Sequence, residues 1–321
     1  MAVILGIMGS PRKGGNSDHL LSIFLDEFRG QGHIIRQFNI SDMNISPCMG
    51  CGFCEIEGFC KFSDDMEEVN HLLRMADLVI LSTPIFFYGM PSQTKALIDR
   101  VQALWARRYR FKLKEPKADS RRGFLLSVGA TRGKNLFLGV ELTCRYFFDA
   151  ISASFEGYLG FREVDRAGEI VNHPTAFKEC RDKAREFLRS LNGRKRILFI
   201  CQENARRSQM AQAFLEYYGK ERFDVQSAGN SPASRIDPVV IEVMAERGID
   251  IAYRRPKAYG EICQAEFDLI VQMGCEIQCP AGYGSTIENW DLEDPKGKSK
   301  EDLSKIRDQI EHRVKNLISK T

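Results

Sequence analysis

Residues 196–201 read RILFIC, and residues 202–208 continue as QENARRS before a segment with the composition of a helix. A continuous apolar run of this kind is typical of a strand buried on both faces of a parallel sheet. Residues 3–8 repeat the arrangement as VILGIM, followed by a Gly-rich turn and an amphipathic segment at 17–29. Each run therefore predicts the first strand of an α/β domain with a parallel sheet.

The chain has 321 residues, about twice the length of a typical single domain. A predicted helix at 174–191 ends at Asn192-Gly193, a typical helix C-terminus. We therefore expect two three-layer α/β domains, at 1–193 and 194–321. The other predicted strands are 34–39, 78–82, 124–128 and 156–161 in the first domain, and 224–228, 269–272 and 286–290 in the second.

The composition argues against several functional classes. A formal charge of +3 is too small to indicate nucleic acid or an anionic membrane as a main partner. The first apolar run lacks a basic segment before it and a cleavage site after it, so we expect a buried strand and not a signal peptide. No apolar stretch approaches the roughly 20 residues of a membrane span, and we expect a cytoplasmic protein.

Residues 105–122 are irregular and carry eight basic side chains against two acidic ones. They could form a solvated surface excursion, or they could attract the phosphate of a nicotinamide cofactor or an acidic partner. The sequence leaves both interpretations open.

The loop after RILFIC combines a cysteine with an arginine and a serine at a strand–helix junction. Backbone N–H groups and a helix N-terminus bind anions, and Arg207 can hold two oxygens of one anion. The same positive field favours the thiolate form of Cys201, and Ser208 can donate a hydrogen bond to the sulfur. The loop therefore predicts a cysteine nucleophile for a tetrahedral oxyanion, which is bound by Gln202, Glu203, Asn204, Ala205, Arg206 and Arg207.

From residue 196 onward the chain resembles the arsenate reductase branch of the low-molecular-weight phosphatase superfamily. The resemblance is carried by the Cys201 loop with RSQMAQAF, by Ser227-Ala228-Gly229, by VQMGCEIQCP and by ENWDLEDP. It implies that Asp294, of the Asp294-Pro295 pair, protonates the departing oxygen. Asp291 is a weaker candidate for this acid.

Cys275 and Cys279 favour a reductase over a phosphatase acting on phosphate monoesters. Hydrolysis needs one cysteine, whereas reduction of As(V) to As(III) needs two electrons and hence further thiols. The resemblance implies that one of these thiols resolves the Cys201 adduct, leaving a disulfide. Their spacing resembles members that use a low-molecular-weight thiol more than the thioredoxin-coupled members.

Four features depart from the family pattern. Arg206 stands where thioredoxin-coupled members often have another cysteine. Glu203 stands where the loop is usually small or neutral, and Gln212 replaces a glutamate of a potassium site found in some members. Lys296-Gly297 follows Asp294-Pro295 where phosphatases place aromatic residues, and this difference also favours a reductase.

The first domain carries Gly, Ser, Thr and aromatic residues after three predicted strands, at the sheet edge where open α/β sheets bind ligands. These segments resemble the NAD(P)H-dependent FMN reductases of flavodoxin fold, and particularly their iron–sulfur flavoprotein relatives, through GSPRKGGNS, STPIFFYGMPSQTKALIDR and VGATRGKNLFLG. The resemblance implies FMN bound by Ser10, Arg12, Asn16, Ser17, Thr83, Pro84, Ile85, Phe86, Tyr88, Gly89, Gly129, Ala130 and Thr131.

Cys48, Cys51, Cys54 and Cys60 lie in a Gly-rich stretch. Four close thiolates suit a [4Fe–4S] cluster, and the spacing resembles that of the iron–sulfur flavoproteins. Zinc would also accept four cysteines, and thiols without metal are a third interpretation. Cys144, Cys180 and Cys263 lie in helical patterns and are expected to be inert.

Together the two halves predict an arsenate reductase fused to an FMN reductase that draws on NAD(P)H or ferredoxin. The flavin half would return electrons to the cysteines, directly or through thioredoxin or a small thiol. A phosphatase with an independent flavin reductase is one alternative, and a redox-sensing flavoprotein without turnover is another. The resemblance also implies a homo-oligomer formed through the flavin domain.

Overall fold

The computed structural model describes residues 2–262, 266–274 and 286–320. The chain divides into two compact units. One unit comprises Ala2–Phe111 and Ser120–Asn192, and the other comprises Lys112–Asp119 together with the described residues from Gly193 onward. Both units are α/β with parallel sheets, which confirms the predicted fold class.

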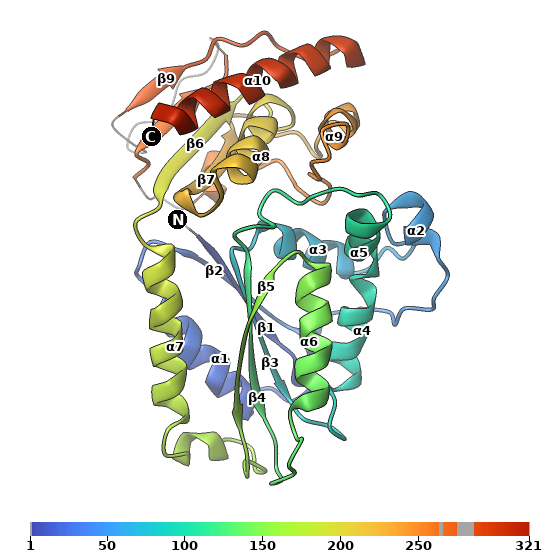
Figure 1. Ribbon diagram of the computed structural model, residues 1–321, viewed down its shortest axis with the longest axis vertical. Coiled ribbons are helices and arrows are strands. Elements are labelled where there is room, and N and C mark those ends of the chain that lie inside the picture. The colour runs from blue at the N-terminus through green and yellow to red at the C-terminus, as the bar shows by residue number, and fades with distance from the viewer. Residues whose placement is uncertain (1, 263–265, 275–285, 321) are drawn as a thin grey trace. The chain divides into compact units, whose positions relative to one another are not determined.

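The first unit contains a five-stranded parallel sheet in the order β2-β1-β3-β4-β5 (Figure 1). This is the strand order of flavodoxin-like folds, whose ligands bind beyond the carboxyl ends of the strands. The strands are β1 (Val3–Met8), β2 (Ile34–Asn39), β3 (Leu78–Pro84), β4 (Arg122–Val128) and β5 (Ser154–Phe161).

Helices cover both faces of this sheet, with α1 and α7 on one face and α4 to α6 on the other (Figure 1). Their bounds are α1 (Asn16–Asp26), α2 (Phe53–Glu57), α3 (Met66–Met75), α4 (Ser92–Arg100), α5 (Gln102–Tyr109), α6 (Leu138–Ala150) and α7 (Ala176–Leu191), with 3₁₀ turns η1 (Ile40–Asp42) and η2 (Glu169–Asn172). Helix α7 ends at Leu191, and Gly193 has a φ of +82°, a conformation that glycine adopts readily.

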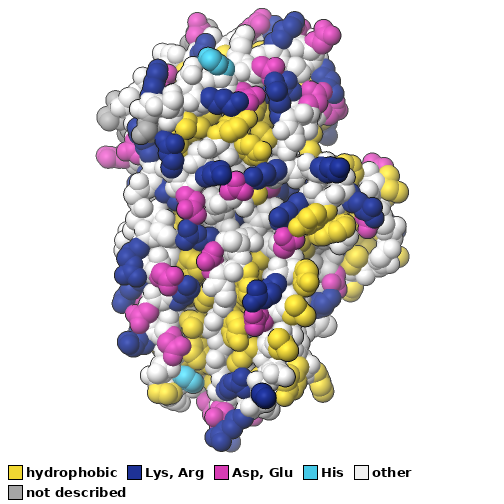
Figure 2. Space-filling model, viewed as in Figure 1, with side chains coloured by type: hydrophobic (Ala, Val, Ile, Leu, Met, Phe, Trp, Pro, Cys, Tyr) yellow, Lys and Arg dark blue, Asp and Glu magenta, His cyan; other side chains and the backbone are white. Residues whose placement is uncertain are grey.

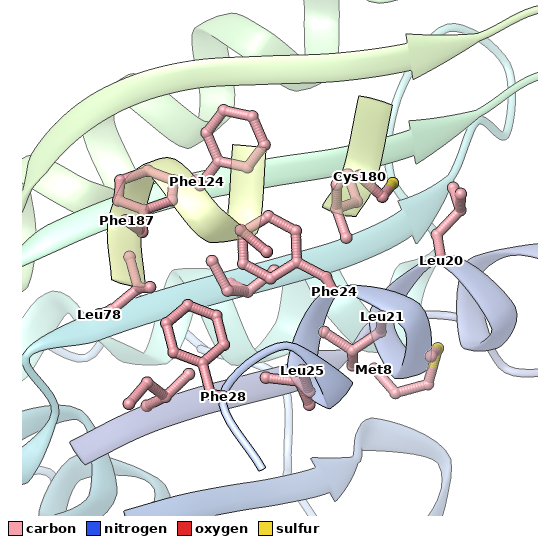
Figure 3. Close-up of a cluster of buried hydrophobic side chains, with 14 of the residues drawn as sticks. Met8, Leu20, Leu21, Phe24, Leu25, Phe28, Leu78, Phe124, Cys180 and Phe187 are labelled. Carbon is pink, nitrogen blue, oxygen red and sulfur yellow. The ribbon is translucent and has the colours of Figure 1, made fainter. Parts of the chain in front are cut away.

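Aromatic side chains fill the space between α1, α7 and the sheet (Figure 3). The ring of Phe24 lies 5.9 Å from that of Phe124 and 6.2 Å from that of Phe187. All three side chains are almost completely buried. Burial of this apolar surface is the main force that holds α1 and α7 on the sheet, and it fixes the loop that joins β1 to α1.

The second unit contains a four-stranded parallel sheet in the order β7-β6-β8-β9. Its elements are β6 (Lys195–Cys201), α8 (Arg207–Gly219), η3 (Lys220–Arg222), β7 (Phe223–Gly229), α9 (Pro238–Ala245), η4 (Tyr259–Glu261), β8 (Leu269–Gln272), β9 (Ile287–Asn289) and α10 (Lys300–Lys320). Helix α8 packs on β6 and β7, and α10 packs against α8 and α9.

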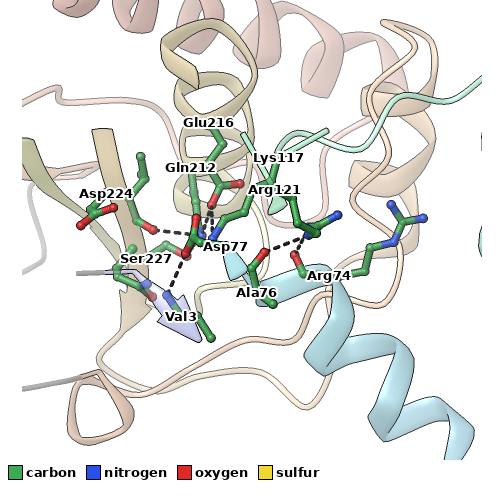
Figure 4. A network of polar contacts seen from close by, with 12 residues as sticks. Val3, Arg74, Ala76, Asp77, Lys117, Arg121, Gln212, Glu216, Asp224 and Ser227 are labelled. Atoms are coloured by element: carbon green, nitrogen blue, oxygen red, sulfur yellow. Dashed lines mark hydrogen bonds and ion pairs between the residues drawn. The ribbon is translucent and has the colours of Figure 1, made fainter. Parts of the chain in front are cut away.

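Residues 112–119 belong to the second unit although they lie between α5 and β4 in the sequence. The backbone N–H of Lys114 donates to the carbonyl of Gly248 at 2.7 Å, and that of Asp250 donates to the carbonyl of Lys114 at 2.9 Å. Lys117 is buried and its ammonium lies 3.9 Å from the carboxylate of Glu216 on α8 (Figure 4). The interpretation of this stretch as a solvated surface excursion is therefore wrong for residues 114–117, whereas Lys112 and Asp119 are exposed.

Arg121 corrects the same interpretation within the first unit. Its guanidinium is almost completely buried and donates to the carbonyls of Ala76, Ile151 and Arg74 at 2.7–2.8 Å (Figure 4). A buried guanidinium with its donors satisfied holds several segments together. The possible attraction of a nicotinamide phosphate by the remaining basic side chains stays a prediction.

The surface carries mixed charge, and helix α6 presents an apolar stripe. On the face shown in Figure 2, basic and acidic side chains are interspersed. Leu138, Leu142 and Tyr146 are spaced four residues apart on α6 and are all more than half exposed. Among the described residues, no helix is long and apolar enough to cross a membrane. The predicted homo-oligomer stays a prediction.

Candidate active site and cofactor sites

Cys201 is the last residue of β6 and is 3% exposed. Its Sγ atom lies 2.9 Å from the Oγ atom of Ser208 and accepts a hydrogen bond from the backbone N–H of Asn204 at 3.1 Å. Ser208 stands in the first turn of α8, whose N-terminal dipole favours negative charge nearby. The strand end and the helix start thus bring the predicted nucleophile and its hydroxyl partner together.

Asn204 holds the loop in shape. Its φ of 49° is in the left-handed region, which costs energy unless other contacts fix it. Its side-chain amide donates to Ser208 Oγ at 2.8 Å, while its Oδ1 accepts from Gln209 Nε2 at 3.0 Å and from the backbone N–H of Lys257 at 2.7 Å. The strained residue is therefore hydrogen-bonded on both sides, and it aims its own N–H at the sulfur.

Gly229, at the end of β7, lets the loop lie close to the neighbouring strand. A Cβ atom at this position would come within 2.8 Å of the backbone N of Asn204 and of the carbonyl O of Gln202. Its N–H donates to the carbonyl of Lys257 at 2.8 Å. A larger residue at position 229 would displace the oxyanion loop itself.

Arg207 is 3% exposed and is fixed by main-chain acceptors. Its Nη1 donates to the carbonyl of Leu292 at 2.7 Å and to that of Met273 at 3.2 Å. Its Nη2 lies 3.7 Å from Oδ1 of Asp294. The predicted clamp and the predicted acid thus line one site, with the acid half exposed at its edge.

A small cavity opens beside Cys201. It has a volume of about 110 Å³, and its lining among the described residues comprises Cys201, Gln202, Glu203, Arg206, Arg207, Asp294, Pro295 and Lys296. Four of the six predicted oxyanion-loop residues are in this set. Asn204 and Ala205 are not in the set, and both are buried. Asp291, the weaker acid candidate, is absent from the lining.

Glu203 does not face the cavity as an isolated negative charge. Its carboxylate accepts hydrogen bonds from Lys296 Nζ at 2.6 Å and from Arg206 Nη1 at 2.5 Å. Arg206 Nε also donates to Asp237 at 2.7 Å. The hydrogen bond from Lys296, followed by that from Arg206, lowers the pKa of Glu203. Lys296 and Asp237 were not predicted, because their pairing partners lie 93 and 31 residues away in the sequence.

The predicted resolving residues Cys275 and Cys279 lie outside the described residues, as does Cys263. Cys144 and Cys180 are buried, and desolvation raises the pKa of Cys180 to about 12. The pKa of Cys144 is raised by the same cause. Both thiols are therefore in the environment expected of inert cysteines.

In the first unit, a cavity of about 230 Å³ lies at the carboxyl ends of β1, β3 and β4. Its lining includes nine of the thirteen predicted flavin-site residues: Ser10, Arg12, Asn16, Ser17, Pro84, Ile85, Phe86, Gly129 and Ala130. Helix α1 begins at its edge, where a helix N-terminus and small residues suit a phosphate. These residues fit the phosphate and one edge of FMN.

The other four predicted flavin-site residues do not line this cavity. Thr83 is completely buried and its hydroxyl donates to the carbonyl of Pro84 at 3.2 Å. Gly89 pairs with Phe86 through two 2.9 Å backbone hydrogen bonds, and Tyr88 within this turn has a φ of 60° and is half exposed. Thr131 is exposed. Because a tight turn follows β3, the side chains of this segment point in different directions, and only some of them line the cavity.

Cys48, Cys51, Cys54 and Cys60 all line one cavity of about 380 Å³. Gly50, Gly52 and Gly58 have φ values of 66–73°, so the chain bends sharply between the cysteines. Burial raises the pKa of the Cys54 thiol, and nearby Cys60 and Cys48 add to this. Among the described residues, no group of three or more His, Cys, Asp or Glu is arranged to hold a metal ion. The shared cavity and the all-thiol donor set nevertheless fit an iron–sulfur cluster.

Arg100 anchors this loop and was not predicted to do so. Its guanidinium makes two hydrogen bonds to Asp64, at 2.7 and 2.9 Å, and one to the carbonyl of Ser46 at 2.7 Å. It also lies over the ring of Phe62, 4.9 Å from the centroid. The paired charges are almost completely buried, so loss of either would leave an uncompensated charge.

Comparison with known proteins matches each half of the chain to a protein family. Residues 196–321 match the family model for low molecular weight phosphotyrosine protein phosphatases, and residues 2–135 match that for NADPH-dependent FMN reductases. The chain is 35% identical to a glutaredoxin arsenate reductase of Synechocystis sp. over 129 residues, which are 39% of this chain and 98% of the relative.

The N-terminal half is similar to an iron–sulfur flavoprotein of Methanosarcina thermophila, with 38% identity over 129 residues. The match covers 40% of this chain, and the chain spans 64% of that relative's length. A solved structure described as an arsenate reductase in the phosphate binding state is 34% identical over 39% of this chain and 98% of its own, with a TM-score of 0.37.

The chain therefore carries an NADPH-dependent FMN reductase domain in its N-terminal half, and its C-terminal half belongs to the low molecular weight phosphotyrosine protein phosphatase family together with arsenate reductases.

Proposed function

We propose that the chain reduces arsenate, As(V), to arsenite, As(III), with Cys201 as the nucleophile. The observation that carries the proposal is the set of contacts at the sulfur: Ser208 at 2.9 Å, the N–H of Asn204 at 3.1 Å, and a small cavity shared with Arg207. The similarity to a glutaredoxin arsenate reductase over nearly its whole length supports arsenate as the oxyanion.

In the first step, the Cys201 thiolate attacks arsenic and an S–As bond forms. One oxygen leaves as water, and Asp294 at the cavity edge supplies a proton to it. Arg207 is already oriented by the carbonyls of Leu292 and Met273, so it can stabilise the oxyanion without a large rearrangement.

In the second step, the thiolate of Cys275 or Cys279 attacks the Cys201 sulfur. An S–S bond forms, the S–As bond breaks, and its electron pair stays on arsenic, which leaves as arsenite. Arsenic gains two electrons and the two cysteines lose them as a disulfide. A reductant must then return two electrons before the next cycle.

The first unit fits the role of that reductant. Ser10, Arg12, Asn16 and Ser17 would hold the FMN phosphate, and Ile85, Phe86, Gly129 and Ala130 would contact the ring. Cys48, Cys51, Cys54 and Cys60 would hold a [4Fe–4S] cluster. When bound, the flavin supplies conversion between two-electron hydride chemistry with NAD(P)H and one-electron chemistry with a cluster or ferredoxin.

The test is arsenite formation by purified protein with NAD(P)H and no added thiol. Many turnovers per chain are expected, and Cys201→Ser should abolish them. Arsenite limited to one equivalent per chain would refute intramolecular supply of electrons. Activity restored by thioredoxin or a small thiol would identify an external donor instead.

The phosphatase alternative rests on the family model for residues 196–321. A double variant distinguishes it from the arsenate reductase proposal. Replacing Cys275 and Cys279 by Ser should abolish arsenate turnover. Hydrolysis of an aryl phosphate that survives this change at a rate comparable to that of known phosphatases would favour the alternative.

A further inference from the structure

The cavity beside Cys201 is bounded by an ion pair between two separate loops. Glu203 stands in the oxyanion loop, and Lys296 follows the Asp294-Pro295 pair. Lys296 Nζ lies 2.6 Å from Oε1 of Glu203, and both residues line the cavity together with Cys201 and Arg207. The pair thus links the loop that carries the nucleophile to the segment that carries the predicted acid.

Glu203 is held in this position from a second side. Arg206 Nη1 donates to Oε2 of Glu203, and Arg206 Nε donates to Oδ2 of Asp237 at the start of α9. Arg206 is 18% and Glu203 26% exposed at the side chain. Glu203 is therefore fixed by a partly buried partner, and Lys296, at 64% exposed, is the member of the group that can move.

The volume of the cavity limits what it can hold. At about 110 Å³ it is less than half the 230 Å³ of the flavin cavity and far below the roughly 300 Å³ at which pockets for drug-sized ligands begin. A free tetrahedral oxyanion is a compact group of five heavy atoms. An aryl ester of the same oxyanion adds a ring, which would have to project out of the cavity through its opening, here called the mouth.

Charge makes the mouth more restrictive. If Lys296 moves aside to admit an ester, Glu203 loses one of its two cations while a dianionic substrate lies in the same small site. Like charges brought together in a confined site weaken binding. With Lys296 in place, the described part of the lining carries three cations and two carboxylates, which suits a small anion.

We propose that Glu203 and Lys296 form a specificity barrier that admits free tetrahedral oxyanions, such as arsenate and inorganic phosphate, and excludes phosphate monoesters. This inference rests on the proposed function only in taking the Cys201 loop as the oxyanion site. It explains, from this chain's own residues, why a phosphatase-type loop would not act on bulky esters.

The experiment measures protection of Cys201 against alkylation by iodoacetamide, with the modified peptide quantified by mass spectrometry. Inorganic phosphate, arsenate and phenyl phosphate are the three probes. For the wild-type chain, half-protection should need about tenfold or more phenyl phosphate than inorganic phosphate. In Lys296→Ala the half-protecting concentration of phenyl phosphate, divided by that of inorganic phosphate, should fall severalfold. The same ratio should also fall in Glu203→Gln.

Lys298→Ala is the matched control, because Lys298 pairs with Glu293 and is absent from the cavity lining. It should leave both concentrations unchanged. Equal protection of the wild-type chain by phenyl phosphate and phosphate would overturn the barrier, and so would an unchanged ratio in both Lys296→Ala and Glu203→Gln.

The two proposals can fail separately. If no arsenite forms but the wild-type and variant ratios are as expected, the reductase proposal fails and the barrier stands. If arsenite forms but phenyl phosphate protects as well as phosphate, the barrier fails and the reductase proposal stands.

Discussion

The Oγ atom of Ser208 lies 2.9 Å from the Sγ atom of Cys201 and also accepts a hydrogen bond from the side-chain amide of Asn204 at 2.8 Å. The amide occupies one acceptor position of the hydroxyl oxygen, and the hydroxyl proton can be donated to the sulfur. A hydroxyl in this arrangement stabilises the thiolate before attack and again when the sulfur is a leaving group.

Replacing Ser208 by Ala removes this donor from a buried sulfur. Hydrogen bonds to charged groups contribute about 1.5–3 kcal/mol, so Cys201 should react with iodoacetamide about tenfold or more slowly at neutral pH. The measurement is the alkylation rate of the Cys201 peptide between pH 6 and 9. Ser319→Ala, on the exposed end of α10, is the control. An unchanged rate would remove Ser208 from the mechanism.

Gly229→Ala should damage the oxyanion loop without unfolding the unit. The added Cβ meets main-chain atoms of Asn204 and Gln202 at 2.8 Å, and these cannot yield as a flexible side chain would. We expect phosphate to protect Cys201 about tenfold less well, since a loop displaced by a few tenths of an ångström no longer aims its N–H groups at the anion.

Gly260 offers the matched control for this substitution. A Cβ atom there has no neighbour within 4 Å, and the residue lies in the same unit. Gly260→Ala should therefore bind phosphate as the wild-type chain does. If the two variants bind phosphate equally well, the close approach at Gly229 does not determine the loop.

Arg12→Ala should weaken FMN binding. Arg12 lines the cavity at the start of α1, where a phosphate would lie, and a charge-assisted hydrogen bond contributes about 1.5–3 kcal/mol, or roughly 10–100-fold in Kd. The measurement is quenching of FMN fluorescence on titration with apoprotein. The neighbouring Lys13, which pairs with Asp42 and does not line the cavity, supplies the control Lys13→Ala. Equal Kd values for the two variants would place the phosphate elsewhere.

Lys257 predicts a pH dependence of stability. Although the residue is partly exposed, its ammonium is withdrawn from water, and this desolvation, opposed by Glu216 and aided by Arg254 and Lys117, lowers its pKa from 10.5 to about 7. Between these two values the unfolded chain binds a proton that the folded chain does not. Stability therefore rises with pH from about 7 to about 10.5 and is independent of this group below pH 7.

Lys257→Met removes that dependence. The free energy of unfolding of the wild-type chain should increase relative to that of the variant as the pH rises from 7 to 9.5, by about 1–3 kcal/mol, because each unit of pKa difference is worth about 1.4 kcal/mol. Urea titrations at several pH values measure it. Lys305→Met, at an exposed position on α10, is the control, and its free energy of unfolding should change with pH as that of the wild type does. A constant difference between wild type and Lys257→Met would contradict the lowered pKa.

The fold was predictable because buried parallel strands appear in the sequence as continuous apolar runs. The runs at 3–8, 78–82 and 196–201 lie within strands β1, β3 and β6, each followed by the loop that lines a cavity. The Cys201 loop was predictable for the same reason, since its chemistry is contained in eight consecutive residues.

Contacts between distant segments were not predictable. The pairing of Glu203 with Lys296 depends on how two loops 93 residues apart approach each other, and nothing local in either loop indicates it. Thr83 illustrates a different limit. Its place at the end of β3 suggested a ligand contact, but the direction of its side chain depends on packing, which buries it completely.

The segment at residues 112–119 yields the last prediction. It adds a parallel bridge at Lys114 and Ile249 to the second unit, and its Lys117 lies in the buried group around Glu216. Glu216 is on α8, the helix that begins at Arg207 beside the nucleophile, and it also pairs with Arg254 and accepts from Gln212. Removing the segment should therefore destabilise the unit that carries the active site, although the segment is encoded within the flavin half.

Replacing residues 112–119 by a Gly/Ser linker of equal length loosens two backbone hydrogen bonds and removes two buried charged side chains, Glu115 and Lys117. At about 1 kcal/mol for each hydrogen bond and more for the ion pair, stability should fall by roughly 2–5 kcal/mol. Calorimetry with and without FMN distinguishes the two transitions, because the flavin should shift only the transition of the first unit. The same replacement at residues 30–32, an exposed turn of the first unit, should leave the transition of the second unit in place. If the 112–119 variant also leaves it in place, the second unit is stable without the segment.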